Sequence, residues 1–149
     1  MLTYEIPKIG TVVVGCMRES ERGFVHNGYV QGIVDALGHG PKSKSRHRRH
    51  YLRSIGHDCD RLLSADDTVA LVARDDDSGA LAYGFVLYAH GIVQWVYVKE
   101  AFRGGGLGRE LLGLARLDGC ARFAFHTRHD GVMYKAGLRY AEPERRGHG

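Results

Sequence analysis

The chain has 149 residues, the usual length of one domain, and 44% of them are hydrophobic, enough to form a buried core. Its formal net charge of +4 and pI near 9.1 suit an anionic ligand without specifying which one. Three widely spaced cysteines exclude a disulfide framework, and no apolar run reaches the length of a signal peptide or membrane span. The sequence therefore predicts a soluble, cytoplasmic protein.

The first predicted elements are a strand and two helical segments. Residues 11–17 (TVVVGCM) form a β-branched run that predicts a strand. Residues 18–37 predict one or two amphipathic helices, residues 38–50 a loop, and residues 51–63 another helix. The positions expected to be buried on the first helical segment are Phe24, Val25, Tyr29, Ile33, Val34 and Leu37.

Three consecutive strands are expected next, at residues 68–74, 81–90 and 91–99. An acidic turn at 75–79 and a turn at His90-Gly91 indicate that these strands are antiparallel. A helix after the glycine-rich segment, a strand at 120–127, a helix at 131–137 and a strand at 138–140 complete the chain. This order predicts a single α/β or α+β domain over residues 1–149, with one mixed sheet.

The segment FRGGGLGREL (102–111) places four glycines at the start of a leucine-patterned helix. It is not a Walker loop, because Arg109-Glu110 follows Gly108 where Lys-Ser/Thr is required. It is not a dinucleotide fingerprint either, because Arg109 stands where the last glycine would be. The remaining interpretation is a helix N-terminus whose N–H groups and dipole hold a pyrophosphate. The alternative is a tight strand-to-helix turn, although one glycine would suffice for a turn.

The longer segment VYVKEAFRGGGLGRELL resembles the acyl-CoA-binding motif of the GNAT superfamily of N-acyltransferases. In that motif a strand ending in hydrophobic-x-Val precedes Arg/Gln-x-x-Gly-x-Gly/Ala at the start of a helix. Arg103, Gly106 and Gly108 occupy the defining positions, and the resemblance extends more loosely over residues 68–140. It implies a largely antiparallel mixed sheet with helices on both faces, whose strands 91–99 and 120–127 splay apart to form a CoA cleft.

The resemblance also implies a reaction and a binding site. An amine would attack the thioester of acetyl-CoA directly, and a backbone N–H near the strand end would stabilise the oxyanion. The pantetheine arm would pair with the end of strand 91–99, and the glycine-rich turn would hold the pyrophosphate. The implied cofactor-binding residues are Val96, Tyr97, Val98, Arg103, Gly104, Gly105, Gly106, Leu107, Gly108 and Arg109.

The candidate catalytic residues are Tyr134 and His126. GNAT relatives often carry a general-acid tyrosine four residues before a glycine, and Tyr134 lies three residues before Gly137. A packing role for Tyr134 is the alternative. His126, at the end of strand 120–127, is a candidate base. The other candidate bases are a chain of water molecules and the side chains of His90, Glu100 and His129.

A basic run occupies residues 42–53, with six cations and no acid: Lys42, Lys44, Arg46, Arg48, Arg49 and Arg53. It is either a solvated surface or a docking site for an anionic partner. The second interpretation supports an alternative function, a nucleic-acid-directed protein of the same fold that acylates an amine on DNA or RNA, or only binds it. A homodimer is also left open. No metal is expected, because His47, His50, His57 and Cys59 lack a standard zinc spacing.

Overall fold

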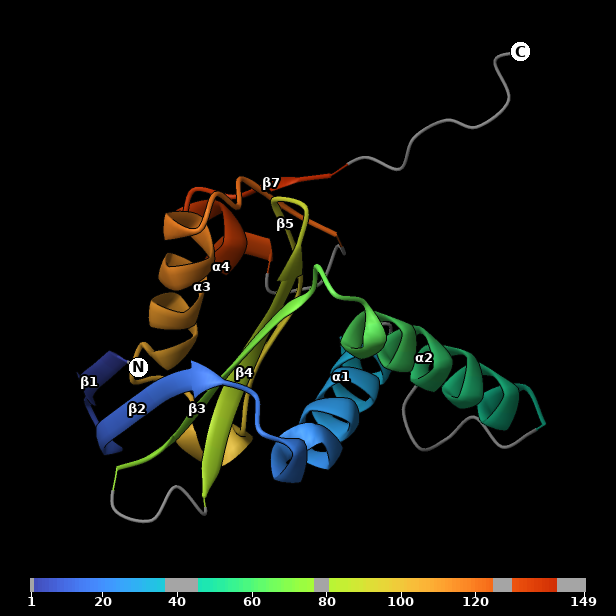
Figure 1. Ribbon diagram of the computed structural model, residues 1–149, viewed down its shortest axis with the longest axis horizontal. Coiled ribbons are helices and arrows are strands. Elements are labelled where there is room, and N and C mark those ends of the chain that lie inside the picture. Colours follow the sequence, from blue (N-terminus) through green and yellow to red (C-terminus); the bar gives the residue numbers. More distant parts are fainter. Residues whose placement is uncertain (1, 37–45, 77–80, 125–129, 142–149) are drawn as a thin grey trace.

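The computed structural model describes residues 2–36, 46–76, 81–124 and 130–141 (Figure 1). Within these residues, one sheet contains seven strands in chain order. The strands are β1 (Leu2–Ile6), β2 (Gly10–Cys16), β3 (Val69–Asp75), β4 (Ala82–Ala89), β5 (Ile92–Val98), β6 (Arg122–Phe123) and β7 (Arg139–Tyr140). The pairings from β1 to β5 are antiparallel, and those of β6 with β5 and β7 are parallel. The predicted mixed, largely antiparallel sheet is thereby confirmed.

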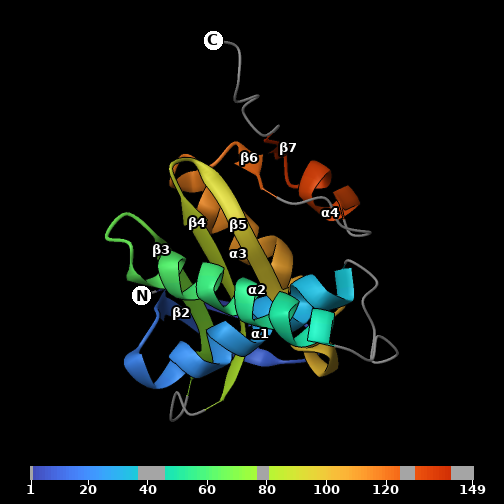
Figure 2. The same ribbon diagram turned by 90° about the vertical axis from the view of Figure 1, so that its right-hand side faces the viewer.

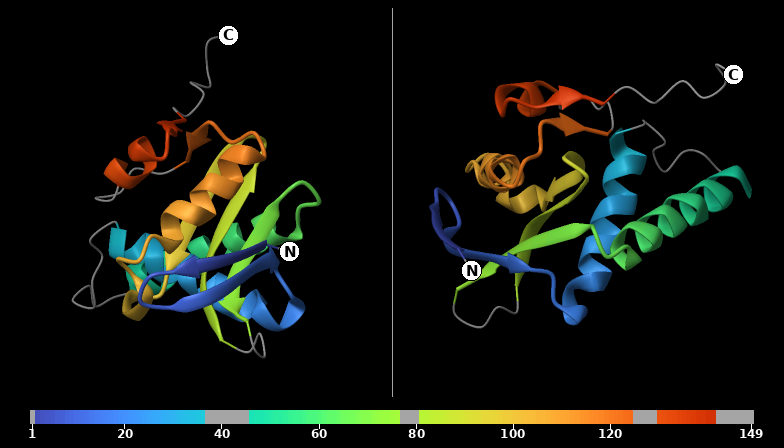
Figure 3. Two further views of the ribbon diagram at one scale, coloured as in Figure 1. Left: turned by 90° about the vertical axis from the view of Figure 1, so that its left-hand side faces the viewer. Right: turned by 45° about the horizontal axis from the view of Figure 1, so that its top comes forward.

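Helices cover both faces of the sheet, as predicted (Figures 2 and 3). One face carries α1 (Arg22–Ala36) and α2 (Arg46–Ser64). The other face carries α3 (Leu107–Leu117) and the short helix α4 (Asp130–Lys135). Two short 3-10 helices, η1 (Glu19–Glu21) and η2 (Glu100–Phe102), lead into α1 and toward α3.

The two faces of the sheet bury two separate apolar clusters. Alternation along β4 explains the division, because successive side chains of a strand point to opposite faces. Phe85 and Leu87 pack in the cluster beneath α1 and α2, whereas Val86 and Tyr88 pack in the cluster beneath α3. The burial expected for α1 is confirmed at Val25, Tyr29, Ile33 and Val34, and Phe24 is half-buried; Leu37 lies outside the described residues.

Helix α1 lies very close to the sheet because it carries two glycines one turn apart. A Cβ on Gly28 would lie 2.6 Å from Phe85 Cε1, and a Cβ on Gly32 would lie 2.6 Å from Trp95 Nε1. Real Cβ atoms do not approach other atoms so closely, so any larger residue would push α1 away from these rings. The Gly28–Gly32 spacing therefore fixes the distance between α1 and strands β4 and β5.

Three sequence predictions of element bounds were wrong. Strand β1 was not predicted; its side chains are mostly exposed, so it lacks the apolar alternation that marks a half-buried strand. Helix α2 begins at Arg46, inside the predicted loop 38–50; arginine is a good helix former, which here outweighs the unfavourable effect of cations on the helix dipole in a first turn. In the described part of predicted strand 120–127, only residues 122 and 123 are in a strand; residues 125–129 are not described.

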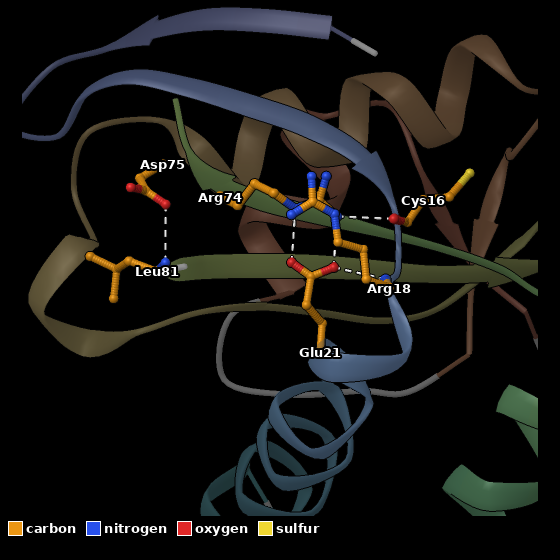
Figure 4. Close-up of polar contacts among 6 residues, drawn as sticks. All are labelled: Cys16, Arg18, Glu21, Arg74, Asp75 and Leu81. Atoms are coloured by element: carbon orange, nitrogen blue, oxygen red, sulfur yellow. Dashed lines mark hydrogen bonds and ion pairs between the residues drawn. The ribbon is translucent and has the colours of Figure 1, made fainter. Parts of the chain in front are cut away.

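A buried ion pair fastens the start of α1 to the sheet (Figure 4). Arg74 on β3 donates to both carboxylate oxygens of Glu21, at 2.8 and 2.7 Å, and to the Cys16 carbonyl at 2.9 Å. The Arg18 backbone N–H donates to the same carboxylate at 2.8 Å. Both side chains are less than 10% exposed, so the charges are compensated by each other rather than by water.

Candidate functional site

The glycine-rich turn connects the end of β5 to α3, and its glycines have distinct roles. Gly104 and the N-cap residue Gly106 have φ angles of +92° and +91°, which side-chain-bearing residues rarely adopt. A Cβ on Gly105 would lie 2.2 Å from the Pro7 carbonyl oxygen of the β1–β2 turn. A Cβ on Gly108 would meet only Val98 Cγ2, at an ordinary 3.7 Å.

The expectation that one glycine would suffice for the turn is therefore wrong. Three of the four glycines are required by the chain's own geometry, two for backbone conformation and one for its contact with Pro7. Gly108 is the exception, because the fold would accept a side chain there. Gly106 and Gly108 also border open space, which is what a ligand approaching the backbone requires.

The start of α3 presents unpaired backbone donors to this space. The first bond of the helix runs from Glu110 N–H to the Gly106 carbonyl at 3.1 Å. The N–H groups of the three residues before Glu110 consequently have no partner within the helix. Together with the positive end of the helix dipole, they form a site suited to phosphate oxygens.

Strand β6 covers only the first two residues of β5. In the described part of the chain, β6 pairs with β5 only at Ile92 and Val93, while on its other side β5 pairs with β4 as far as Val98. A bulge at Gln94 interrupts the β4–β5 register at the position where the separation from β6 begins. Among the described residues, the edge of β5 from Gln94 to Val98 therefore has no strand partner on the β6 side, as the predicted splay requires.

A cavity of about 430 Å³ lies where β5 and β6 separate. Its walls come from β5, the glycine-rich turn, the residues at the end of β6, α4 and the last turn of α1. Every residue of the predicted cofactor-binding set lines it except Gly105, which faces Pro7. The other lining residues are Gly32, Asp35, Val93, Gln94, Trp95, Phe102, Phe123, Ala124, Val132 and Met133.

Arg103 is held at the rim of this cavity by two contacts. Its Nε donates to the Val98 carbonyl at 2.7 Å, and its guanidinium lies 5.7 Å from the centre of the Tyr97 ring. Arg109, in the first turn of α3, is exposed and also lines the cavity. Two cations and the helix N-terminus thus give this end a positive potential.

The wall of the cavity formed by α1 and α4 was not predicted from the sequence. Gly32 and Asp35 line the cavity from α1, with Gly32 next to Trp95, and Val132 and Met133 line it from α4. The spacing of Gly28 and Gly32 could have predicted that one face of α1 packs closely against a neighbour, because residues at i and i+4 lie on the same helix face. Nothing in the sequence indicated that this face of α1 meets Trp95.

The candidate catalytic residues have different surroundings. Tyr134 is 52% exposed and packs edge-on against Phe123, with ring centres 5.5 Å apart, while its neighbour Met133 lines the cavity. His90 is exposed in the β4–β5 turn and pairs with Asp67, at the end of β5 far from the glycine-rich turn. Glu100 is exposed in η2. His126 and His129 lie outside the described residues.

A second cavity of about 680 Å³ lies between α1 and α2, and Tyr97 borders both cavities. His26 and Asp60 line this second cavity, and their Nε2 and Oδ1 atoms are 3.7 Å apart across the two helices. Arg53 and Lys99 line it as well. Its lining therefore mixes cations with a single carboxylate, in contrast to the separated charges of the first cavity.

The basic run and the candidate metal residues fall partly outside the described side chains. Residues 42–45 are not described, and 46–49 are described as helix only. His50 and His57 are exposed on α2, whereas Cys59 is fully buried in the apolar cluster beneath it. The described residues contain no group of three or more potential metal ligands. None of the described helices has both the length and the apolar character needed to cross a bilayer.

No protein-family model matches the chain, and no curated protein matches it in sequence. Solved structures do match. A possible acetyltransferase from Clostridium difficile 630 has a TM-score of 0.64 at 9% identity, covering 93% of this chain and 97% of that one. A GCN5-related N-acetyltransferase from Rhodopseudomonas palustris has a TM-score of 0.57 at 12% identity, covering 91% and 82%.

A third similar structure is spermidine N-acetyltransferase from Vibrio cholerae in complex with CoA and spermine. Its TM-score is 0.53 at 12% identity, and the match covers 85% of this chain and 79% of that one. These similarities, with the splayed strands and the glycine-rich start of α3, define the class of fold. The chain has the GNAT fold, as its motif implied.

Proposed function

We propose that the protein is an N-acetyltransferase that uses acetyl-CoA and transfers the acetyl group directly to an amine. The observation that carries this proposal is the cavity between β5 and β6, with the N-terminus of α3 at one end. The GNAT fold supports it, as do the CoA complexes known for similar structures.

The positive end of the cavity suits the diphosphate of CoA. The first-turn N–H groups of α3 would donate to phosphate oxygens, and the guanidinium groups of Arg103 and Arg109 add charge. The open space in front of Gly106 and Gly108 leaves room for these oxygens close to the backbone. From there, the edge of β5 that β6 leaves uncovered would provide backbone partners for the amide groups of the pantetheine arm.

The reaction that fits this arrangement is a direct displacement. The acceptor nitrogen, after losing a proton, attacks the thioester carbonyl carbon, and the resulting oxyanion accepts a hydrogen bond from a backbone N–H of β5 near the bulge at Gln94. The C–S bond then breaks, the thiolate of CoA takes up a proton, and the amide nitrogen loses one. The balance is one ammonium and acetyl-CoA giving one acetamide, CoA and a proton.

The test compares two glycines of the same helix. Gly108→Val adds a side chain at the mouth of the cavity, in a conformation that accepts it, and should reduce acetyl-CoA affinity at least 100-fold by blocking approach to the backbone. Gly113→Val is the matched control, because Gly113 also has open space but does not line the cavity. Isothermal titration calorimetry with acetyl-CoA measures both affinities.

Thermal unfolding of both variants shows whether each remains folded. If folded Gly108→Val binds acetyl-CoA as tightly as the parent protein, the start of α3 is not the diphosphate site. If the parent protein does not bind acetyl-CoA, the proposed function itself is wrong.

A further inference from the structure

The charges that line the first cavity are separated by sign. Arg103 and Arg109 lie at the glycine-rich end, and Asp35 is the one carboxylate among the described residues that line the cavity. Asp35 comes from α1, on the opposite face of the sheet from α3. A ligand spanning the cavity would therefore meet positive potential at one end and negative potential at the other.

The position of Asp35 follows from how α1 packs. Gly32 abuts the Trp95 indole, and Asp35 lies one helical turn further along the same face. Trp95 follows the bulge at Gln94, while the glycine-rich turn begins after Val98. At about 3.3 Å per residue, the two ends of the site are separated by roughly 10 Å of strand. Asp35 therefore lies on the side of the cavity where the thioester, rather than the diphosphate, would be placed.

The side chain of Asp35 is oriented by a neighbour on the same helix. Gln31 Nε2 donates to Asp35 Oδ1 at 3.0 Å, and both side chains are exposed. This bond uses one of the two carboxylate oxygens and leaves the other available to a ligand. No cation among the described side chains forms an ion pair with Asp35.

We propose that Asp35 binds the ammonium group of the acceptor, which passes a proton to water before its nitrogen attacks the thioester, and that the acceptors of this enzyme are cationic primary amines. The inference rests on the proposed function, which it makes more specific. A carboxylate and an ammonium form a charge-assisted hydrogen bond, which is stronger than one between neutral groups. Asp35 is thus a residue that determines substrate specificity by selecting acceptors according to charge.

The experiment uses acetyl-CoA at saturation and follows release of free CoA. n-Butylamine and 1,4-diaminobutane are the cationic probes, and aniline is the neutral one. Asp35→Asn keeps the shape and the contact with Gln31 but removes the charge. We expect it to raise KM for both cationic probes about tenfold or more, while kcat changes less than threefold and KM for aniline stays within twofold.

Asp60→Asn is the matched control, since it removes a carboxylate from the second cavity. Its KM values should equal those of the parent protein. Calorimetry should give all three proteins the same affinity for acetyl-CoA, which separates a failure of this inference from a failure of the proposed function. The inference is overturned if Asp35→Asn leaves KM for the cationic amines unchanged, if Asp60→Asn alone raises it, or if the acetyl-CoA-bound protein acetylates neither cationic probe.

Discussion

In α4, Met133 lines the first cavity, and the candidate general acid Tyr134 does not. Met133 is 9% exposed, whereas Tyr134 is 52% exposed and packs against Phe123, which lines the cavity. The residue four positions before Gly137, where relatives often carry the general-acid tyrosine, is Met133. The position of Tyr134 therefore favours the packing alternative over the general-acid prediction.

Tyr134→Phe removes only the hydroxyl group and keeps the ring contact with Phe123. We expect kcat to remain within threefold of the parent value, because water can protonate the leaving thiolate when no side chain does. Steady-state kinetics with n-butylamine as acceptor measures this. A decrease in kcat of about 100-fold or more, with unchanged acetyl-CoA affinity, would instead establish Tyr134 as the general acid.

At the scale of elements, the Glu21–Arg74 ion pair determines how the start of α1 is attached to the sheet. Burial by itself raises the pKa of Glu21, but the hydrogen bonds from Arg74 and from the Arg18 N–H, together with the Arg74 charge, lower it below its usual value. Because the folded-state pKa is the lower one, the pair stabilises the fold above the pKa of the unfolded chain. This contribution is lost as the pH falls through the lowered pKa of the folded state.

Glu21→Gln should reduce the free energy of unfolding at pH 7 by about 3 kcal/mol, because it leaves the Arg74 guanidinium buried without a counter-charge. Urea unfolding measures the loss. The variant should also be less sensitive than the parent protein to a decrease of pH below the ordinary pKa of a glutamate, because there the unfolded parent chain takes up a proton that its folded state binds only at still lower pH.

A suitable control is Asp58→Asn. Asp58 pairs with Arg61 on the exposed surface of α2, where an ion pair contributes little. If Glu21→Gln and Asp58→Asn lose equal stability, the buried ion pair does not fasten α1 as we infer.

The elements differ in how far the sequence could predict them. Strands β3, β4 and β5 and helix α3 were predicted because each carries a complete local pattern: β-branched alternation, a His-Gly turn, or leucines at helical spacing. Strand β1 was missed because it takes its partner from β2 and buries little of its own surface. Residues 120, 121 and 124 were predicted as strand but lie outside β6, because the point at which its pairing with β5 ends is a tertiary feature.

The candidate site was predictable on one side only. The glycine-rich turn is contiguous in sequence, so its motif identified that wall of the cavity. Asp35 lies about 60 residues before Val98, and Met133 lies about 35 residues after it. Local patterns contain no information on which distant segments meet, so the wall formed by α1 and α4 required the structure.

For the molecule as a whole, the sheet divides the apolar core into two layers, and the first cavity lies where both layers contribute. Trp95 belongs to the cluster beneath α1 and α2, while Leu107 and Met133 belong to the cluster beneath α3, and all three line the cavity. The lining of the cavity therefore comes from both faces of the sheet.

The strand order also has a consequence for how fast each part of the sheet can assemble. The β4–β5 turn contains only His90 and Gly91, but β2 must pair with β3 across the long segment that contains α1 and α2. Closing that loop costs more chain entropy, so the β3–β4–β5 meander should form in the folding transition state before β2 joins it.

Val86 and Val14 are buried in the same cluster and provide a matched test. In stopped-flow refolding, Val86→Ala should slow folding, whereas Val14→Ala should mainly accelerate unfolding. The reverse pattern would mean that the wall of the cavity forms last, after the amino-terminal strands.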